Sequence, residues 1–390
     1  MRVSILALLF AALCQPCLSG WEVTRVHPAG ADWSQLMGIS GRYAVGEIAY
    51  TNGPPNVTVQ AALYDLDRGT WKPLDTRDTT ANAVSDMWAA GFLYQPGNAS
   101  VVKATAWPLA GGPALDLQPA GALTSKLTSA SGQLLAGSAQ FAGKIHAYVW
   151  DLAGGQEYDL HPPAAVNGSQ VNGIDGTRSV GEIGLGGGTG SHAVLWPSLA
   201  AGYVDLNPTG AVYGSTAYDI SDNTQVGEVD GLAALWRGSA GSYVNLHPSW
   251  LPSAALSYAL GADAHVQVGY VDYDRGAGTF PRFPAHATVW FGTAASMFDL
   301  HSLLDPAYYR DSVANDVWVD ELGNIYVVGS AARVNGGPAE ALLWTYVVPE
   351  PGSVAALALG LAGLPFFRRP RGITCRSRPT TSSGPCTRHP

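Results

Sequence analysis

Apolar and polar positions alternate in short runs along most of the chain, and one run recurs at a nearly regular interval. It is a short apolar segment that ends in an aromatic residue; the seven aromatic residues are Tyr64, Trp107, Trp150, Trp196, Trp236, Trp290 and Trp344. Successive copies lie 43, 43, 46, 40, 54 and 54 residues apart. Short alternating runs at a repeated period predict β-strands arranged in a repeat array.

The segments on either side of each copy recur as well. Ten or more residues before it comes a Val-Gly pair or a close variant, at Val45-Gly46, Ala90-Gly91, Ala136-Gly137, Val180-Gly181, Val226-Gly227, Val268-Gly269 and Val328-Gly329. About ten residues after it comes a second short strand ending in Leu-x-Pro, as in Leu160-His161-Pro162. With turn-forming residues between the segments, each unit is predicted to hold four short strands.

Seven such units suit the blades of a β-propeller. The last copy stops at Trp344 with no Leu-x-Pro strand after it, whereas residues 21–28 resemble that strand without a preceding copy. If this segment completes the last unit, the ring closes and no sheet edge stays bare. The sequence therefore predicts an all-β, seven-bladed propeller over residues 21–346; a β-solenoid or an open repeat array is the alternative.

The two ends of the chain carry export signals. Residues 1–20 have a basic start at Arg2, an apolar stretch and small residues before Trp21, which predicts a secretory signal peptide handled by the Sec export machinery. Residues 352–367 hold only Gly, Ser, Pro and apolar residues, and Arg368 and Arg369 follow directly. A C-terminal transmembrane helix with its basic end in the cytoplasm is predicted, which leaves the body outside.

The order of Pro349-Glu350-Pro351, an apolar run and an arginine cluster resembles the PEP-CTERM sorting domain over residues 347–371. The resemblance implies that an exosortase recognises Pro349, Glu350 and Pro351, and that Arg368 and Arg369 act as the stop signal. The protein would then be anchored transiently in the inner membrane before it reaches the cell surface or extracellular matrix. Residues 372–390 extend beyond the usual end of that domain, and their composition predicts a disordered basic tail; a genuine tail and a frame error in the gene are both open.

The repeats also resemble HAF-type extracellular repeats. In that pattern a His-Ala-Phe-Leu-Trp strand is followed by Asp-Leu and accompanied by Val-Val-Gly. Residues 192–196, Asp205-Leu206 and Val180-Gly181 follow the same order. The resemblance implies no established activity.

Charge and cysteine content narrow the possible partners. Residues 21–347 hold 14 basic and 29 acidic residues, a net charge of −15, so nucleic acid is excluded as a partner. The four cysteines lie outside this body, at Cys14, Cys17, Cys375 and Cys386, so no disulfide stabilises it. Its stability must come from packing and strand pairing.

No catalytic constellation, metal site or cofactor is predicted, because the histidines and aspartates mostly occupy repeat positions. Glu47, Glu182 and Glu228 each follow a Val-Gly pair and could form a carboxylate collar at one mouth of the ring that binds cations or sugars. Three tryptophans outside the repeat set are candidates for exposed contact with sugars: Trp88, Trp250 and Trp318.

The sequence favours a non-enzymatic protein of the cell surface or exopolysaccharide matrix. Its role would be to bind an extracellular polysaccharide or a protein, or to serve as a purely structural component of that layer. The alternative is an extracellular enzyme acting on polysaccharide at the mouth of the propeller channel.

Overall fold

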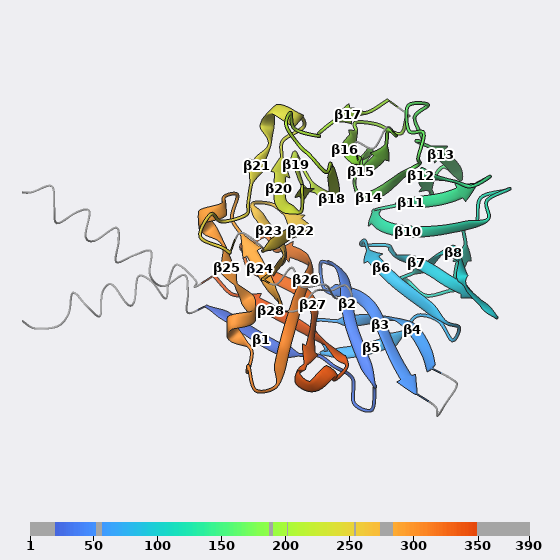
Figure 1. Ribbon diagram of the computed structural model, residues 1–390. Coiled ribbons are helices and arrows are strands. Elements are labelled where there is room, and N and C mark those ends of the chain that lie inside the picture. The colour runs from blue at the N-terminus through green and yellow to red at the C-terminus, as the bar shows by residue number, and fades with distance from the viewer. Residues whose placement is uncertain are drawn as a thin grey trace, which may run out of the picture. The chain divides into compact units, whose positions relative to one another are not determined.

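The computed structural model describes residues 20–51, 57–186, 190–200, 202–252, 255–273 and 284–348. Seven four-stranded antiparallel sheets make up this part of the chain and stand side by side around a ring (Figure 1). The predicted signal peptide, the anchor segment from residue 349 onward and the tail lie outside the described residues. The alternative of a solenoid or an open array is therefore wrong, and the seven-bladed propeller is confirmed.

Within blades 1 to 6 the strands follow one another in sequence order from the centre outward. Blade 1 consists of β2 (Trp33–Ser40), β3 (Tyr43–Thr51), β4 (Val57–Asp65) and β5 (Thr70–Pro73). Blade 2 consists of β6 (Thr79–Val84), β7 (Trp88–Gln95), β8 (Asn98–Pro108) and β9 (Leu115–Asp116). Blade 3 consists of β10 (Thr124–Ser131), β11 (Leu134–Phe141), β12 (Lys144–Asp151) and β13 (Gln156–Asp159).

Blades 4 to 6 repeat this order. Blade 4 consists of β14 (Ser169–Asp175), β15 (Arg178–Gly184), β16 (Ser191–Trp196) and β17 (Val204–Asp205). Blade 5 consists of β18 (Ser215–Ser221), β19 (Thr224–Val229), β20 (Leu232–Trp236) and β21 (Val244–Asn245). Blade 6 consists of β22 (Leu256–Asp263), β23 (Val266–Asp272), β24 (Ala285–Trp290) and β25 (Phe298–Asp299). Short 3-10 turns occur at Ala240–Ser242, Ala294–Ser296, Leu300–Leu303 and Val334–Gly336. Among the described residues, no helix has the length and apolar character needed to cross a membrane.

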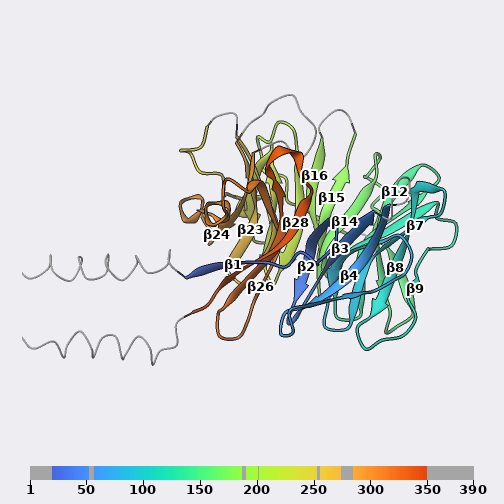
Figure 2. The same ribbon diagram turned by 90° about the horizontal axis from the view of Figure 1, so that it is seen from below.

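Blade 7 is closed by the N-terminal strand. It contains β26 (Tyr309–Val319), β27 (Ile325–Arg333) and β28 (Ala339–Tyr346), and its outer strand is β1 (Trp21–Arg25). β1 runs antiparallel to β28, with Trp21 opposite Tyr346 and Arg25 opposite Leu342 (Figure 2). The predicted closure by residues 21–28 is confirmed.

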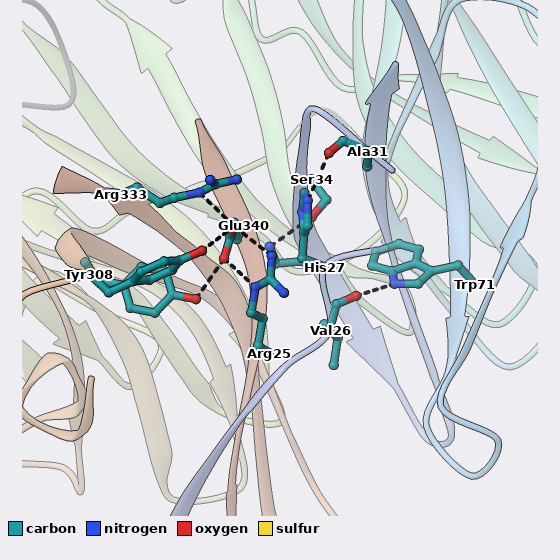
Figure 3. A network of polar contacts seen from close by, with 11 residues as sticks. Arg25, Val26, His27, Ala31, Ser34, Trp71, Tyr308, Arg333 and Glu340 are labelled. Atoms are coloured by element: carbon teal, nitrogen blue, oxygen red, sulfur yellow. Dashed lines mark hydrogen bonds and ion pairs between the residues drawn. The ribbon is translucent and has the colours of Figure 1, made fainter. Parts of the chain in front are cut away.

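A buried carboxylate fastens this closing strand. Glu340 of β28 is completely buried, and both of its oxygens accept hydrogen bonds from Arg25 of β1, at 2.6 and 2.9 Å (Figure 3). The Tyr309 hydroxyl donates at 2.9 Å, and Arg333 Nε lies 2.8 Å away as an ion-pair partner. Burial acts to raise the pKa of Glu340, but the hydrogen bonds from Arg25 and Tyr309 and the nearby guanidinium charges outweigh it and lower that pKa to about 2.

The repeated tryptophans form the core between blades. Trp196, for example, is fully buried and packs with Val149 and Leu160 of the preceding blade. The leucine that follows each outer strand joins the same cores, as Leu160, Leu206, Leu246 and Leu300 do. Because fully burying one apolar side chain stabilises a fold by roughly 1.5–3 kcal/mol, these repeats supply the stability that cysteines cannot.

The glycine of each Val-Gly pair lies opposite a β-bulge in the innermost strand. In every blade the register between the first and second strands shifts at this point. A Cβ atom on Gly227, for instance, would lie 1.9 Å from the carbonyl oxygen of Thr216, and the equivalent glycines of the other blades show the same close approach. The second strand therefore requires glycine there, which explains this repeat in physical terms.

Candidate functional site

The innermost strands line a central channel, and the bulge residues project into it. These seven residues, one from each blade, are Met37, Asn82, Thr128, Asn172, Tyr218, Leu260 and Asn315. Four of them donate a side-chain hydrogen bond to a carbonyl of the next blade; for example, Asn172 Nδ2 lies 2.8 Å from Ala217 O and Asn315 Nδ2 lies 2.6 Å from Leu36 O. Most of the ring is thus sealed by bonds that run from blade to blade.

The residues one position further along form a narrow part of the channel. Small residues occupy five of these seven positions, and Asp219 and Asp316 occupy the other two. A Cβ on Gly261, in the blade between them, would lie 2.9 Å from Asp316 Oδ1. Asp219 Oδ2 accepts the Ala262 N–H at 2.9 Å, and Asp316 Oδ2 accepts the Ile39 N–H at 2.8 Å.

Removal from bulk water raises the pKa of both aspartates, and repulsion from neighbouring carboxylates, including that between the two, adds to the effect. Both side chains keep some exposed surface, because they face the channel. The pair therefore holds a proton at pH values where an ordinary aspartate is ionised. This part of the channel therefore carries less negative charge than two fully ionised aspartates would give it.

A cavity of about 560 Å³ opens at the mouth of the channel and is lined by residues of blades 5, 6, 7 and 1. Its walls include three tyrosines, Tyr218, Tyr258 and Tyr270, together with the amides of Gln35 and Asn315. The rings of Tyr258 and Tyr270 stack with their centroids 5.0 Å apart and an interplanar angle of 28°. We call this cavity the tyrosine pocket.

The hydroxyls of Tyr218 and Tyr270 stay protonated over the whole physiological range. Burial raises the pKa values of Tyr218 and Tyr270, and the charge of Glu228 contributes to both shifts. The pocket wall is therefore uncharged where the rings lie, and it combines flat apolar faces with hydrogen-bonding groups. This combination is typical of sites that bind small polar ligands.

The three glutamates of the predicted collar occupy one repeat position in blades 1, 4 and 5. Glu47 is buried and accepts hydrogen bonds from Gln35 Nε2 and, at 2.7 Å, from the Thr80 hydroxyl of the next blade. Glu182 makes the matching contacts, at 3.1 Å with Gln170 Nε2 and 2.8 Å with the Thr216 hydroxyl. Two of the three carboxylates therefore join neighbouring blades.

Glu228 makes a different contact, because its Oε2 accepts the Gly231 N–H of its own hairpin at 2.6 Å. Burial raises the pKa of Glu228. Glu182 also lines a separate cavity of about 340 Å³ between blades 3 and 4, with Gln170 and Ser191.

The structure places the three candidate tryptophans for contact with sugars apart from one another. Trp88 is half-buried in blade 2, and its Nε1 donates to Gln133 Oε1 of blade 3 at 2.8 Å. Trp318 lines the channel beyond the two aspartates and stacks on Tyr326. Trp250, in the connection between β21 and β22, is 61% exposed, so it alone of the three offers a large open surface.

The repeated histidines and aspartates are held in hydrogen bonds between strands and blades. His146, His192 and His286 each lie 2.8 Å from an aspartate of the neighbouring outer strand. A second set of histidines contacts a serine hydroxyl of the following blade through Nδ1, at 2.8–2.9 Å: His27, His161, His247 and His301. Within the described residues, no three metal-ligating side chains are grouped so that they could hold an ion.

Sequence reasoning missed the channel residues Asp219 and Asp316 and the tyrosine pocket. Tyr218 is the bulge residue of blade 5, and Asp219 and Asp316 each directly follow a bulge residue. A bulge inserts one residue into the alternation and turns it toward the channel. The small-apolar segment before each Val-Gly pair could have signalled this position, since its residue types change from blade to blade while its neighbours repeat.

Comparison with known proteins identifies the C-terminal signal. Residues 347–371 match the family model of the PEP-CTERM protein-sorting motif. The predicted sorting motif is confirmed. It implies an exported protein that passes through the membrane and is processed by an exosortase. No curated protein matches the chain.

Several solved structures are similar to this chain at low sequence identity. An acylaminoacyl peptidase in complex with Z-Gly-Gly-Phe-chloromethyl ketone has a TM-score of 0.52 and 11% identity, covering 84% of this chain and 54% of its own. TolB from Acinetobacter baumannii has a TM-score of 0.39 and 11% identity, covering 78% and 80%. Trypanosoma rangeli sialidase in complex with sialic acid has a TM-score of 0.43 and 9% identity, covering 88% and 61%. The chain spans about half the length of the peptidase, and the likeness shows the fold alone.

Proposed function

We propose that this exported propeller is a non-enzymatic protein of the cell surface or exopolysaccharide matrix that binds an extracellular polysaccharide. The observation that carries the proposal is the mouth of the channel. Aromatic rings and amides line a cavity there, whereas Glu47 and Glu182 are engaged in hydrogen bonds between blades. A wall of this kind binds a polar ring through its aromatic faces and its hydrogen-bonding groups.

Delivery of the body to this location completes the proposal. Exosortase would recognise Pro349, Glu350 and Pro351 and release a body that ends near residue 346. The apolar segment and Arg368-Arg369 would hold the precursor in the inner membrane until that step, and HAF-like repeats would form the released propeller. Residues 372–390 would leave with the anchor.

A glycan array tests the binding function. The full chain, purified in detergent, should bind a subset of extracellular polysaccharides and leave them intact. Absence of binding to any glycan on the array, with the protein shown to be folded by circular dichroism, would overturn the proposal.

The rival function is a polysaccharide-acting enzyme at the same mouth. Glu228 is the residue that favours it, because a carboxyl group whose pKa is raised by burial can act as a general acid. Reducing ends released from the bound glycans, and lost in a Glu228→Gln variant, would establish the enzyme and contradict the binding role.

A further inference from the structure

The tyrosine pocket exists because one blade departs from the pattern of the ring. In blades 2, 4 and 7 the bulge residue is asparagine, and its amide bonds to the carbonyl of the next blade. Blade 5 has Tyr218 at this position, so a large ring stands where a short bridging amide would be. The neighbouring blade adds Tyr258 and Tyr270, which gives three aromatic rings at one side of the channel mouth.

The position of the rings is fixed by packing. Tyr270 is only 5% exposed and backs Tyr258 by stacking against it. Tyr258 and Tyr218 are half-buried and line the open space. A ring that is held in place before a ligand arrives loses little conformational freedom on binding, which favours affinity.

Small residues of blade 7 also line the cavity. They are Ser330, Ala332 and Ala339. A volume of about 560 Å³ lies in the range of small-molecule pockets and accommodates one or two sugar rings. The pocket therefore combines aromatic rings, small residues and the amides of Gln35 and Asn315.

The charge around the pocket selects among sugars. Its lining residues, all within the described part of the chain, include Asp311 but neither lysine nor arginine. Glu228 interacts electrostatically with Tyr218 and Tyr270, so a second carboxyl group lies near the rings. Lys126, a basic side chain of the channel, interacts with Glu182 of blade 4. Arg310 is a cation beside this lining, and it is engaged in a 2.8 Å ion pair with Asp311. A uronate or another acidic sugar would therefore compete with Asp311 for Arg310 and meet the negative charge of Glu228.

We propose that the tyrosine pocket is the subsite that binds a pyranose residue without negative charge, either a neutral sugar or an amino sugar. This inference rests on the proposed polysaccharide-binding function and assigns its location and its selectivity. The apolar face of the sugar lies against Tyr258 or Tyr218, and its hydroxyl or amino groups bond to the amides and to Ser330.

Two substitutions test the location. Tyr218→Asn introduces the residue that blades 2, 4 and 7 carry, and it restores an amide that can reach the Ala259 carbonyl, so the fold should be as stable as before. Tyr258→Ala removes the second ring. The control is Trp250→Ala, which removes the most exposed aromatic candidate outside the channel.

The probes are oligosaccharides of three charge classes: a β-1,4-glucose tetramer, a β-1,4-glucosamine tetramer and a galacturonate tetramer. Binding to the full chain in detergent is measured by isothermal titration calorimetry, and thermal unfolding is followed for every variant. We expect the glucose or glucosamine tetramer to bind, and each tyrosine substitution to weaken it by about tenfold or more, which corresponds to about 1.4 kcal/mol. Trp250→Ala should leave the affinity unchanged.

The outcomes separate the pocket from the proposed function. Undiminished binding in both tyrosine variants, or a tenfold loss in Trp250→Ala alone, would overturn the pocket and leave the binding function standing. Tighter binding of the galacturonate tetramer than of the other two would overturn the charge selectivity. If none of the three tetramers binds while the glycan array shows binding to other glycans, the proposed class of sugar is wrong. The proposed polysaccharide-binding function would still stand.

Discussion

At the scale of single residues, the blade is organised around one close contact between backbones. The glycine of the second strand allows the carbonyl of the bulged first strand to approach to a distance that any Cβ would block. The bulge then turns one residue of each blade toward the channel, where Asn172 and Asn315 join blades and Tyr218 makes a pocket. A backbone requirement thus determines where the functional side chains point.

Substituting this glycine should destabilise the propeller strongly. Gly227→Ala places a Cβ 1.9 Å from the Thr216 carbonyl oxygen, so the two strands must separate. We expect a loss of about 3 kcal/mol or more in the free energy of unfolding, measured by urea denaturation. Gly241→Ala is the matched control, since no atom lies within 4 Å of its added Cβ, and it should change little. Equal stability of the two variants would show that the strands do not approach as described.

At the scale of strands, neighbouring blades are joined by a serine of the first strand. Ser312 accepts the Ala287 N–H of the preceding blade at 3.0 Å and contacts His301 Nδ1 at 2.8 Å. The same arrangement occurs with Ser34, Ser169 and Ser257. Burial lowers the pKa of each histidine in this set, and it lowers that of His301, which stacks on His286 at 4.2 Å, to about 4.

These histidines predict a loss of stability in mild acid. A buried neutral imidazole resists protonation, whereas the unfolded chain takes up its proton below about pH 6.5, so stability falls as the pH falls from 6.5 toward 4. His301 alone contributes up to about 3 kcal/mol to this change. His301→Gln should flatten urea-unfolding stability between pH 6.5 and 4.5, because Gln118 makes the equivalent contact with Ser125 at 2.6 Å and does not titrate.

The raised pKa values of Asp219 and Asp316 act in the opposite sense. The folded state holds a proton there that the unfolded chain has lost, so this contribution is present at low pH and disappears as the pH rises. Comparing His301→Gln with the unchanged protein cancels that contribution. An identical pH profile in both proteins would rule out His301 as a source of acid sensitivity.

The closing strand reverses a charge pattern of the other blades. In blades 3, 4 and 6 a histidine of the third strand pairs with an aspartate next to it on the fourth strand. In blade 7 the third strand supplies Glu340 and the fourth strand supplies Arg25. A fourth strand carrying aspartate would place two carboxylates together at β28, so the reversal favours β1 as its partner.

At the scale of the whole molecule, the sequence predicts the ring but not its channel. The seven copies and the displaced strand at residues 21–28 are visible because burial imposes the same residue types on each blade. The tyrosine pocket depends on residues that differ between blades, namely Tyr218, Tyr258 and Tyr270. It also depends on which blades are adjacent in the ring. A repeat pattern records what the blades share, so it cannot show which of their differing side chains meet.

Ring closure decides whether the channel, its mouth and the tyrosine pocket exist, so it is the claim to test first. The most direct measurement is thermal unfolding of a chain lacking residues 21–28, with and without a synthetic peptide of those residues added back. We predict that the shortened chain unfolds or aggregates, and that the peptide restores cooperative unfolding whereas a peptide with Arg25→Glu does not. An unfolding midpoint equal to that of the complete chain, without any peptide, would contradict the closed ring.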